Sequence, residues 1–376
     1  MADESLKSLF TSIANAIRSK TGKADSINAI DFPKAINSIT SINELKFNEI
    51  VETTALDFYC QAICYGDGKF VAVGSRLNLG LDTANNNTCE GAYSIDGINW
   101  VALRIPTVYS LGDYCRDICY GNGKFVICTK HHLLTSINGI DWEVACTASD
   151  VWAESTYTPS FHSISYGNNT FTVGMSTAAA ISPTFCILSS NDLIAWVRSY
   201  TLTNTYARTK IKYIANTFFI LTEQNTFSCI IHWSTDLTSW KSKTLSDVTD
   251  NISDFTSDTK ILTITTHDYI DALNSPKRGE DDLETTKYIY YAGAEDINSL
   301  QELVHSSYEG IRSITSVTYE NNLFVATLIG TNVVLYSADG MNWMSTLLPI
   351  SAKWHKAFYS NGKWFIVGNG VVAYTE

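Results

Sequence analysis

Residues 113–142 read DYCRDICYGNGKFVICTKHHLLTSINGIDW, and this stretch holds two motifs that recur along the chain. In the first motif, Tyr120 and Phe125 flank an Asn-Gly pair that lies between two apolar runs. In the second motif, Ser136 and Asn138 precede a tryptophan. Asn-Gly between apolar runs is the strongest short-range signal of a β-hairpin, because both turn residues need a positive φ. The stretch therefore predicts paired β-strands.

The hairpin motif occurs six times, each time as an aromatic residue, a four-residue segment and a second aromatic residue. The copies span residues 65–70, 120–125, 166–171, 213–218, 319–324 and 359–364. Recurrence of one short motif along a chain is typical of repeat architectures. We therefore expect a hairpin at the same place in each of a series of similar units.

The second motif follows each hairpin except the last, and its residue types favour a tight turn. Short polar side chains can bond nearby backbone groups in such a turn, and the tryptophan then opens the next strand and packs between sheets. The copies are Ser94, Asp96 and Trp100; Ser136, Asn138 and Trp142; Ser190, Asp192 and Trp196; Ser234, Asp236 and Trp240; and Ser337, Asp339 and Trp343. A degenerate copy, Asp296 followed by Leu300, lies between the fourth and the fifth.

The two motifs alternate and define units of about 40–60 residues. Each unit contains four strands, joined by the hairpin, a longer connection and the polar turn. Four-stranded units of this length are typical of β-propeller blades. The expected fold is all-β, a propeller of about seven blades over residues 43–376, with units that begin near residues 57, 113, 159, 207, 252, 311 and 352.

The last unit ends at Glu376 before any polar turn, so it lacks its outer strand. The stretch Phe47–Thr54, FNEIVETT, precedes the first unit and can supply that strand. Closure of the ring in this way would remove the free sheet edges that invite aggregation. We predict that this N-terminal strand completes the last blade.

Successive blade strands run in opposite directions, which places the hairpins and polar turns at one end of the propeller and the longer connections at the other. The longer connections cover about residues 75–91, 105–113, 146–160, 174–185, 200–207 and 266–286. Long loops on a rigid scaffold are where binding usually occurs.

Four aromatic residues in the long connections are candidate ligand contacts: Tyr109, Trp152, Tyr157 and Tyr206. Aromatic faces suit sugar rings and protein partners. The alternative is that these rings only anchor the loops on the propeller. The acidic residues Glu280–Asp282 and Glu284 could hold a cation, but a solvated loop is the simpler interpretation.

Residues 1–42 do not share the repeat and are predicted to form a short helical segment. Apolar residues recur at helical spacing, and Gly22 is a natural helix end. The apolar stripe consists of Leu6, Leu9, Phe10, Ile13 and Ile17. Two short helices cannot build a core alone, so we expect them to attach to a partner or to further copies of the chain; packing back onto the propeller is the alternative.

Charge and composition exclude several classes of function. The net charge of the 376 residues is −12 and only 17% are charged, which argues against binding to nucleic acid or to an anionic membrane surface. The N-terminus shows no basic flank followed by an apolar core, so no secretory signal is expected. No hydrolase, metalloprotease or phosphate-loop motif occurs, and we expect no catalytic residue, no metal site and no cofactor.

The nine cysteines do not form a disulfide framework by their spacing. Cys60 and Cys64 lie four residues apart in one unit, and Cys115 and Cys119 repeat this spacing in the next. In a regular strand such pairs lie on one face. We expect all four to be buried and reduced.

Two stretches resemble known families. The polar turns resemble the Asp-box of sialidases and related propellers, although Trp lies one residue farther from Ser in that family. The N-terminal segment, LKSLFTSIANAIRSKTGKADSINAIDFPKAINSI, resembles a stretch of tail and other structural proteins of phages and prophages of Gram-positive bacteria. The turns YSIDGINW and YSADGMNW look like repeats of phage tail-associated proteins.

These resemblances imply a virion component, made in the host cytoplasm, that attaches to other virion proteins through residues 1–42. We expect its loop face to bind a glycan or protein of the host surface, without catalysis. One alternative is a purely structural decoration or collar protein that binds no receptor. Another is a sialidase-like glycoside hydrolase, but that chemistry needs three arginines on a substrate carboxylate, and the eight arginines show no such motif.

Overall fold

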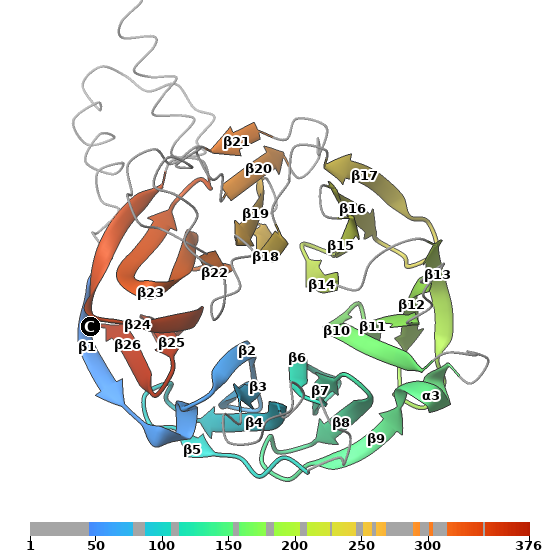
Figure 1. Ribbon diagram of the computed structural model, residues 1–376, viewed down its shortest axis with the longest axis horizontal. Coiled ribbons are helices and arrows are strands. Elements are labelled where there is room, and N and C mark those ends of the chain that lie inside the picture. Colours follow the sequence, from blue (N-terminus) through green and yellow to red (C-terminus); the bar gives the residue numbers. More distant parts are fainter. Residues whose placement is uncertain are drawn as a thin grey trace, which may run out of the picture.

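The chain forms a ring of β-sheets arranged around a central opening (Figure 1). The computed structural model describes residues 45–77, 87–106, 113–152, 158–177, 184–203, 209–225, 228–245, 251–257, 261–267, 289–293, 301–303, 314–340 and 343–376. The sheets are antiparallel throughout the described residues, and consecutive strands of a sheet lie side by side. The expected all-β propeller is confirmed.

Five sheets contain four strands each, in chain order from the centre of the ring outward. They are β2 (Tyr59–Gly66), β3 (Lys69–Leu77), β4 (Asn87–Ser94) and β5 (Val101–Ala102); β6 (Cys115–Gly121), β7 (Lys124–Thr129), β8 (His132–Ser136) and β9 (Glu143–Thr147); β10 (Pro159–Gly167), β11 (Thr170–Thr177), β12 (Thr184–Ser190) and β13 (Val197–Thr203); β14 (Thr209–Ile214), β15 (Thr217–Asn225), β16 (Ser228–Ser234) and β17 (Lys241–Leu245); and β18 (Asn251–Ser257), β19 (Ile261–His267), β20 (Ile289–Gly293) and β21 (Gln301–Leu303).

The remaining strands form one six-stranded sheet, so the prediction of about seven separate blades is wrong as stated: five four-stranded blades are present. The order in the six-stranded sheet is β1 (Phe47–Glu52), β26 (Val371–Thr375), β25 (Lys363–Gly368), β24 (Met344–Ser360), β23 (Leu323–Ser337) and β22 (Ile314–Glu320). The reason is that β23 and β24 are unusually long. The predicted boundary near residue 352 falls inside β24, which pairs with β23 through its first part and with β25 through its second.

The N-terminal strand closes the ring as predicted. Strand β1 pairs with the last strand, β26, in antiparallel fashion, and Phe47 lies opposite Thr375. Because β26 runs back toward the Asn361–Gly362 hairpin, β1 begins at the end of the ring where the hairpins lie.

The predicted hairpins have the expected backbone. Both central residues of each turn have positive φ, for example 48° at Asn122 and 73° at Gly123. The glycine before the turn has a second role, since a Cβ at Gly66 would overlap the ring of Tyr120 in the next blade. Gly121 and Gly167 receive the next tyrosine in the same way. The aromatic residue of the motif therefore packs against the preceding blade.

The polar turns are structural, as predicted. In the first copy the Ser94 hydroxyl donates to Asp96 Oδ1 over 2.9 Å and accepts from the Gly97 N–H. Asp96 Oδ1 in turn accepts the N–H groups of Ile98 and Asn99. The copies at Ser136, Ser190 and Ser234 repeat this set of bonds, and Ser337 bonds Asp339 in the same manner. The indole N–H groups of Trp100, Trp240 and Trp343 close their turns on a backbone carbonyl. The degenerate copy at Asp296 lies outside the described residues.

The core lies between neighbouring sheets. One buried cluster, for example, joins Val71 and Val73 of β3 to Ile118, Phe125 and other residues of the next blade. Burial of such side chains contributes about 25 cal/mol per Å² of apolar surface and is the main force that holds adjacent blades together.

A β-bulge changes the faces that the paired cysteines occupy. The register shifts between Cys60 and Ala62, so Cys60 packs in one interblade cluster and Cys64 against another. The same shift follows Cys115 in β6, which separates it from Cys119. The prediction that each pair shares a face is wrong, because the extra residue of the bulge reverses the alternation.

A disulfide links Cys89 of β4 to Cys115 of β6, with the two Cα atoms 5.1 Å apart. The prediction that Cys115 is reduced is therefore wrong, whereas Cys60, Cys64 and Cys119 are free. The pairing joins two neighbouring blades, and for this reason the spacing of cysteines within one unit did not reveal it.

We expect Cys89→Ser to lower the free energy of unfolding by about 3.5 kcal/mol, because the crosslink closes a loop with a sequence separation of 26 residues. Urea unfolding of the oxidised protein and the variant measures the difference. A reductant should destabilise the wild type by a similar amount and leave the variant unchanged. Equal unfolding midpoints for the reduced and oxidised wild type would contradict the prediction.

Several expectations concern residues outside those described. They are the helical segment 1–42 with Leu6, Leu9, Phe10, Ile13 and Ile17, and the acidic residues Glu280–Asp282 and Glu284. Within the described residues, no helix has both the length and the apolar character needed to cross a membrane.

Candidate functional site

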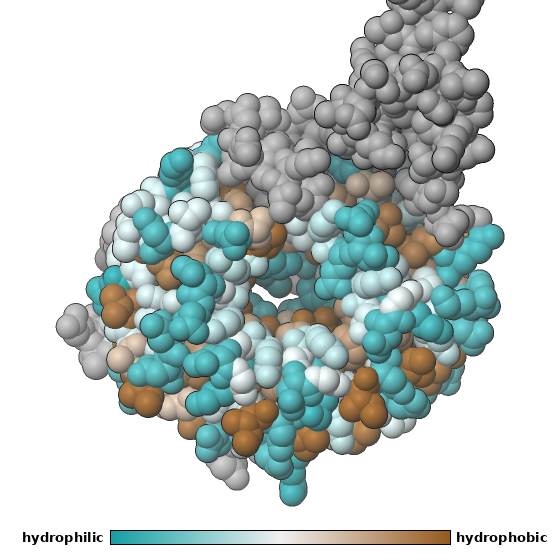
Figure 2. All heavy atoms as spheres, turned by 180° about the vertical axis from the view of Figure 1, so that it is seen from behind, coloured by the Kyte–Doolittle hydropathy of each residue, from teal (hydrophilic) through white to brown (hydrophobic). Residues whose placement is uncertain are grey.

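The inner strands carry polar side chains at the centre of the ring, and these are the candidate site. We call the residue that follows the bulge of each inner strand, and its equivalent in β14, a belt residue. The belt residues are Ala62, Asp117, Ser163, Lys210, Asp254, Ser316 and Lys356. Figure 2 shows an opening at the centre of the ring that these strands surround.

The belt residues provide hydrogen bonds between neighbouring inner strands. The free edge of each inner strand carries backbone groups that need such partners. The Ser163 hydroxyl donates to Asp117 and accepts the N–H of Ile211 over 3.0 Å. Asp117 also accepts the N–H of Ile164. Polar side chains thus join the inner strands β6, β10 and β14 where no further strand can pair with them.

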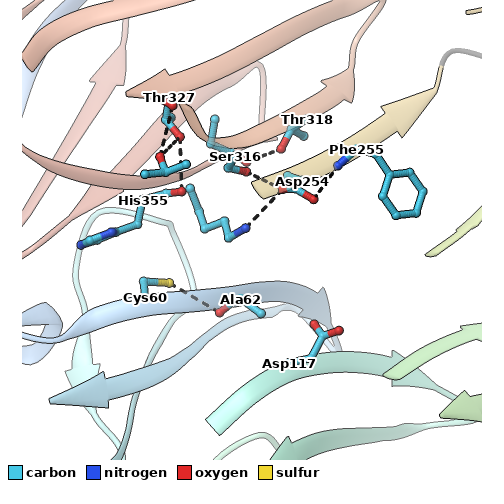
Figure 3. A network of polar contacts seen from close by, with 12 residues as sticks. Cys60, Ala62, Asp117, Asp254, Phe255, Ser316, Thr318, Thr327 and His355 are labelled. Carbon is cyan, nitrogen blue, oxygen red and sulfur yellow. Dashed lines mark hydrogen bonds and ion pairs between the residues drawn. The ribbon is translucent and has the colours of Figure 1, made fainter. Parts of the chain in front are cut away.

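Asp254 is the centre of a buried ion-pair cluster, which we call the Asp254 cluster (Figure 3). Its carboxylate lies 2.6 Å from the Lys212 amine and 3.2 Å from the Lys356 amine. Ser316 donates a hydrogen bond of 2.9 Å to the same carboxylate. Side-chain exposure is 3% for Asp254 and 11% for Lys356, so the cluster is shielded from solvent. It joins four elements: β14, β18, β22 and β24.

The charges of the Asp254 cluster determine the pKa values of its members. Burial by itself raises the pKa of the Asp254 carboxyl, but the ammonium groups of Lys212, Lys356 and Lys210 outweigh burial and hold this pKa well below its usual range. Burial would lower the pKa of Lys356, yet the Asp254 carboxylate outweighs it and raises that pKa. The pair is therefore charged at neutral pH.

Lys210 differs from the other charged belt residues. Burial lowers the pKa of its amine to about 8, and the nearby Lys356 ammonium adds to this effect, while Asp254 and Asp117 oppose it. Among the described residues, no carboxylate lies within ion-pair distance of its amine. Lys210 as a whole residue is partly buried and lies on the inner strand β14.

Arg116 and His162 form a second polar contact beside the belt. The Arg116 guanidinium donates to the Phe161 carbonyl over 2.7 Å and lies 2.9 Å from His162 Nδ1. Burial, then Arg116 and Lys130, lower the pKa of His162 to about 3, so the ring is neutral and can accept from Arg116. The guanidinium is therefore occupied in joining two blades. Within the residues that the structure describes, no group of three metal-ligating side chains is present.

The structure does not present Trp152 to a ligand. Its ring is 8% exposed, packs in an interblade cluster with Ala148, and lies under the Arg198 guanidinium at 4.9 Å. The prediction of an exposed contact is wrong for this residue, because the short helix α3 (Ala148–Val151) turns the indole inward. Tyr109, Tyr157 and Tyr206 lie outside the described residues.

Sequence reasoning missed the Asp254 cluster, although a signal existed. Lys210 and Lys356 stand three residues before the tyrosine of their hairpins, where Ala62 and Ser163 stand in other units. A charged residue at a repeat position that is small elsewhere is unusual in a chain of which 17% is charged. The pairing itself, however, depends on how four successive inner strands, β14, β18, β22 and β24, are arranged in space.

Comparison with known proteins supports the fold alone. No protein-family model and no curated protein sequence matches the chain. Among solved structures, virginiamycin B lyase from Staphylococcus aureus is similar with a TM-score of 0.57 at 12% identity, over 88% of this chain and 100% of that chain. Trypanosoma rangeli sialidase in complex with sialic acid is similar with a TM-score of 0.51 at 12% identity, over 81% of this chain and 57% of that chain. At such identities the likeness assigns the chain to the β-propeller fold and to no family.

Proposed function

We propose that this protein is a non-enzymatic virion component, of a phage tail or tail-like particle, that displays a propeller for binding to the host surface. In this proposal residues 1–42 attach to other virion proteins. The end of the ring with the longer connections contacts a glycan or protein of the host cell. The resemblance of the N-terminal segment to phage structural proteins supports the attachment.

The observation that carries the proposal is that β1 begins at one end of the ring and the longer connections lie at the other. Phe47 begins β1 at the hairpin end of the ring, since it pairs with Thr375. The connections between the second and third strands of a blade lie at the other end, as antiparallel pairing requires. A protein attached through its N-terminal segment would thus present its longer connections away from the attachment point.

We also infer that the six-stranded sheet occupies two blade positions of the ring. Residues Met344–Leu347 of β24 pair with β23, whereas Trp354–Ser360 pair with β25. Each part of the sheet contains its own hairpin, at Asn321–Asn322 and at Asn361–Gly362. The two parts therefore repeat the plan of the four-stranded blades.

Paired surface modifications test which end binds. Lys124 lies beside a hairpin, and Lys130 lies in a connection at the opposite end of the same blade. Lys124→Cys and Lys130→Cys, each carrying a polyethylene glycol chain, are compared for binding of the full chain to host cell walls. We expect the modified Lys130→Cys protein to bind less and the modified Lys124→Cys protein to bind normally. Absence of wild-type binding to host surfaces would refute the recognition role and favour a structural decoration.

Catalysis is the competing function, and the shielded charges at the centre of the ring are the observation that favours it. The lyase and the sialidase of similar fold are enzymes by their names. Hydrolysis of a fluorogenic sialoside, or linearisation of a streptogramin B antibiotic, by the purified protein would establish an enzyme. We expect neither activity, because Arg116 is engaged by the Phe161 carbonyl and His162.

A further inference from the structure

We propose that the Cys89–Cys115 disulfide is a redox-sensitive clamp that holds the start of β4 against the neighbouring blade. Both half-cystines lie at the end of the ring with the longer connections, since β4 and β6 run from that end toward the polar turns and hairpins. The reductant is a low-molecular-weight thiol. The clamp itself is independent of the proposed function, and only its effect on binding rests on that function.

The first argument is the short outer strand of the blade that contains β4. Strand β5 has only two residues, which pair with β4 at Ala92 and Tyr93, and the Leu103 N–H adds one bond to the Gly91 carbonyl. Within the described part of the chain, Asn87–Glu90 therefore has a neighbouring strand, β3, on one side only. In the blade of β10 to β13, by contrast, the outer strand pairs with the third strand from its first residue onward. The disulfide thus supplies an attachment that the outer strand supplies elsewhere.

The second argument is that the two half-cystines are held unequally. Cys115 is fully buried and pairs with Thr129 of β7. Asp113, two residues earlier, has its carboxylate 2.6 Å from His132 Nδ1, so the chain at Cys115 is also held by non-covalent contacts. Cys89 is only partly buried. Loss of the disulfide should therefore release the start of β4 and leave β6 in place.

The third argument is chemical, and it concerns which sulfur an external thiol can reach. Cys89 is the more exposed half-cystine, so a thiolate attacks its Sγ and forms a mixed disulfide there. The bond to Cys115 breaks, and the Cys115 sulfur keeps the electron pair and takes up a proton. A second thiolate then attacks the external sulfur of the mixed disulfide, and Cys89 leaves as a thiolate that is protonated in turn. The two external thiols end as one disulfide, and a low-molecular-weight disulfide reverses both steps.

Hydrogen exchange of the full chain, oxidised and in dithiothreitol, tests the clamp. We expect reduction to speed exchange of the Asn87–Glu90 amides that pair with β3 by at least about 10-fold at times of seconds to minutes, when local opening dominates over global unfolding. The paired amides of residues 218–222 in β15 should exchange at the same early rate in both states, because the disulfide does not touch that blade.

Two variants separate the disulfide from other effects of the reductant. Cys89→Ser should exchange like the reduced wild type, with and without dithiothreitol. Cys64→Ser is the matched control, because Cys64 is a free cysteine that packs against the same interblade cluster as Cys89 and Cys115. It should respond to dithiothreitol as the wild type does.

Binding of the full chain to host cell walls is the second measurement. We expect the oxidised wild type to bind more tightly than the reduced wild type, and Cys89→Ser to bind equally in both conditions. Equal early exchange of Asn87–Glu90 in the oxidised and reduced wild type, or the same acceleration in residues 218–222, would overturn the clamp. A local difference in exchange without cell-wall binding in either state would support the clamp and contradict the recognition role alone.

Discussion

Asp254→Asn is expected to lower the free energy of unfolding by about 3–5 kcal/mol, the usual cost of removing one partner from a buried ion pair. The substitution keeps the shape of the side chain and removes its charge. Lys356, with 11% of its side chain exposed, then has no carboxylate in a place where water cannot replace one. Lys212 is 32% exposed and can regain some hydration, so the larger part of the loss belongs to Lys356. Urea unfolding at neutral pH measures the difference.

A double-mutant cycle distinguishes the stability lost with the ion pair from a general destabilisation of the ring. Lys356→Met removes the second charge, and the double variant should be more stable than Asp254→Asn alone, because an apolar pair is tolerated better than one unpaired charge. Asp96→Asn is a matched control, since it changes the same residue type in a partly buried polar turn where another copy of the motif has Asn138. Equal losses for Asp96→Asn and Asp254→Asn would show that the Asp254 cluster is not a major source of stability.

The elements that could be predicted are those whose chemistry is local. A hairpin needs only two residues that accept positive φ, and Asn122 and Gly123 show both the sequence and the backbone. The polar turn is complete within seven residues, from Ser94 to Trp100, and its hydrogen bonds all lie inside that stretch. Closure by β1 was predictable for a different reason, because the last unit visibly lacked a strand.

The elements that could not be predicted depend on long-range packing or on the extra residue that a β-bulge inserts into a strand. The bulge at Cys60 reverses the side-chain alternation of β2, and nothing in YCQAICYG reveals it. The continuity of β24 through residue 352 merges two expected blades into one sheet. The Cys89–Cys115 disulfide crosses between blades, which a reading of each unit by itself cannot show.

The candidate site could be predicted from the sequence only in part. The inner-strand position of Lys210 and Lys356 follows from the repeat once the hairpins are aligned, whereas Asp254 belongs to a unit without a copy of the hairpin motif. The contact between Asp254 and Lys356, however, joins residues 102 positions apart and skips the strand between them. It depends on how the successive inner strands β18, β22 and β24 curve around the centre of the ring, so the residues are visible in the sequence while their pairing is not.

Acidification from pH 6.5 toward pH 5 is expected to destabilise the protein, because two buried histidines and one partly buried histidine are held neutral. Burial lowers the pKa of His232 and of His355 to about 4, and burial with Arg116 and Lys130 lowers the pKa of His162 to about 3. His232 is 2% exposed and His355 is 1% exposed. In the unfolded chain these rings take up protons near pH 6.5, whereas in the folded protein they do not.

The sign of the effect follows from proton uptake. The unfolded state binds more protons below pH 6.5, so stability falls as pH falls, by about 1.4 kcal/mol per pH unit for each histidine. This loss continues until the folded pKa near 4 is reached. Urea unfolding at several pH values between 7 and 5 should show the combined slope. His232→Gln should reduce that slope by about one quarter to one third, because His162 and His355 remain and burial also lowers the pKa of His131.

Two features of the chain make this test specific. The window above pH 5 lies above the titration of the Asp254 carboxyl, whose lowered pKa would remove stability only at more acid pH. Between pH 7 and 7.5 the wild type should show a smaller slope, since the three rings are mostly neutral there in both states. An unchanged slope in His232→Gln would mean that His232 takes up a proton in the folded state, and its contacts to Tyr200 and Thr222 would then have to accommodate a charged ring.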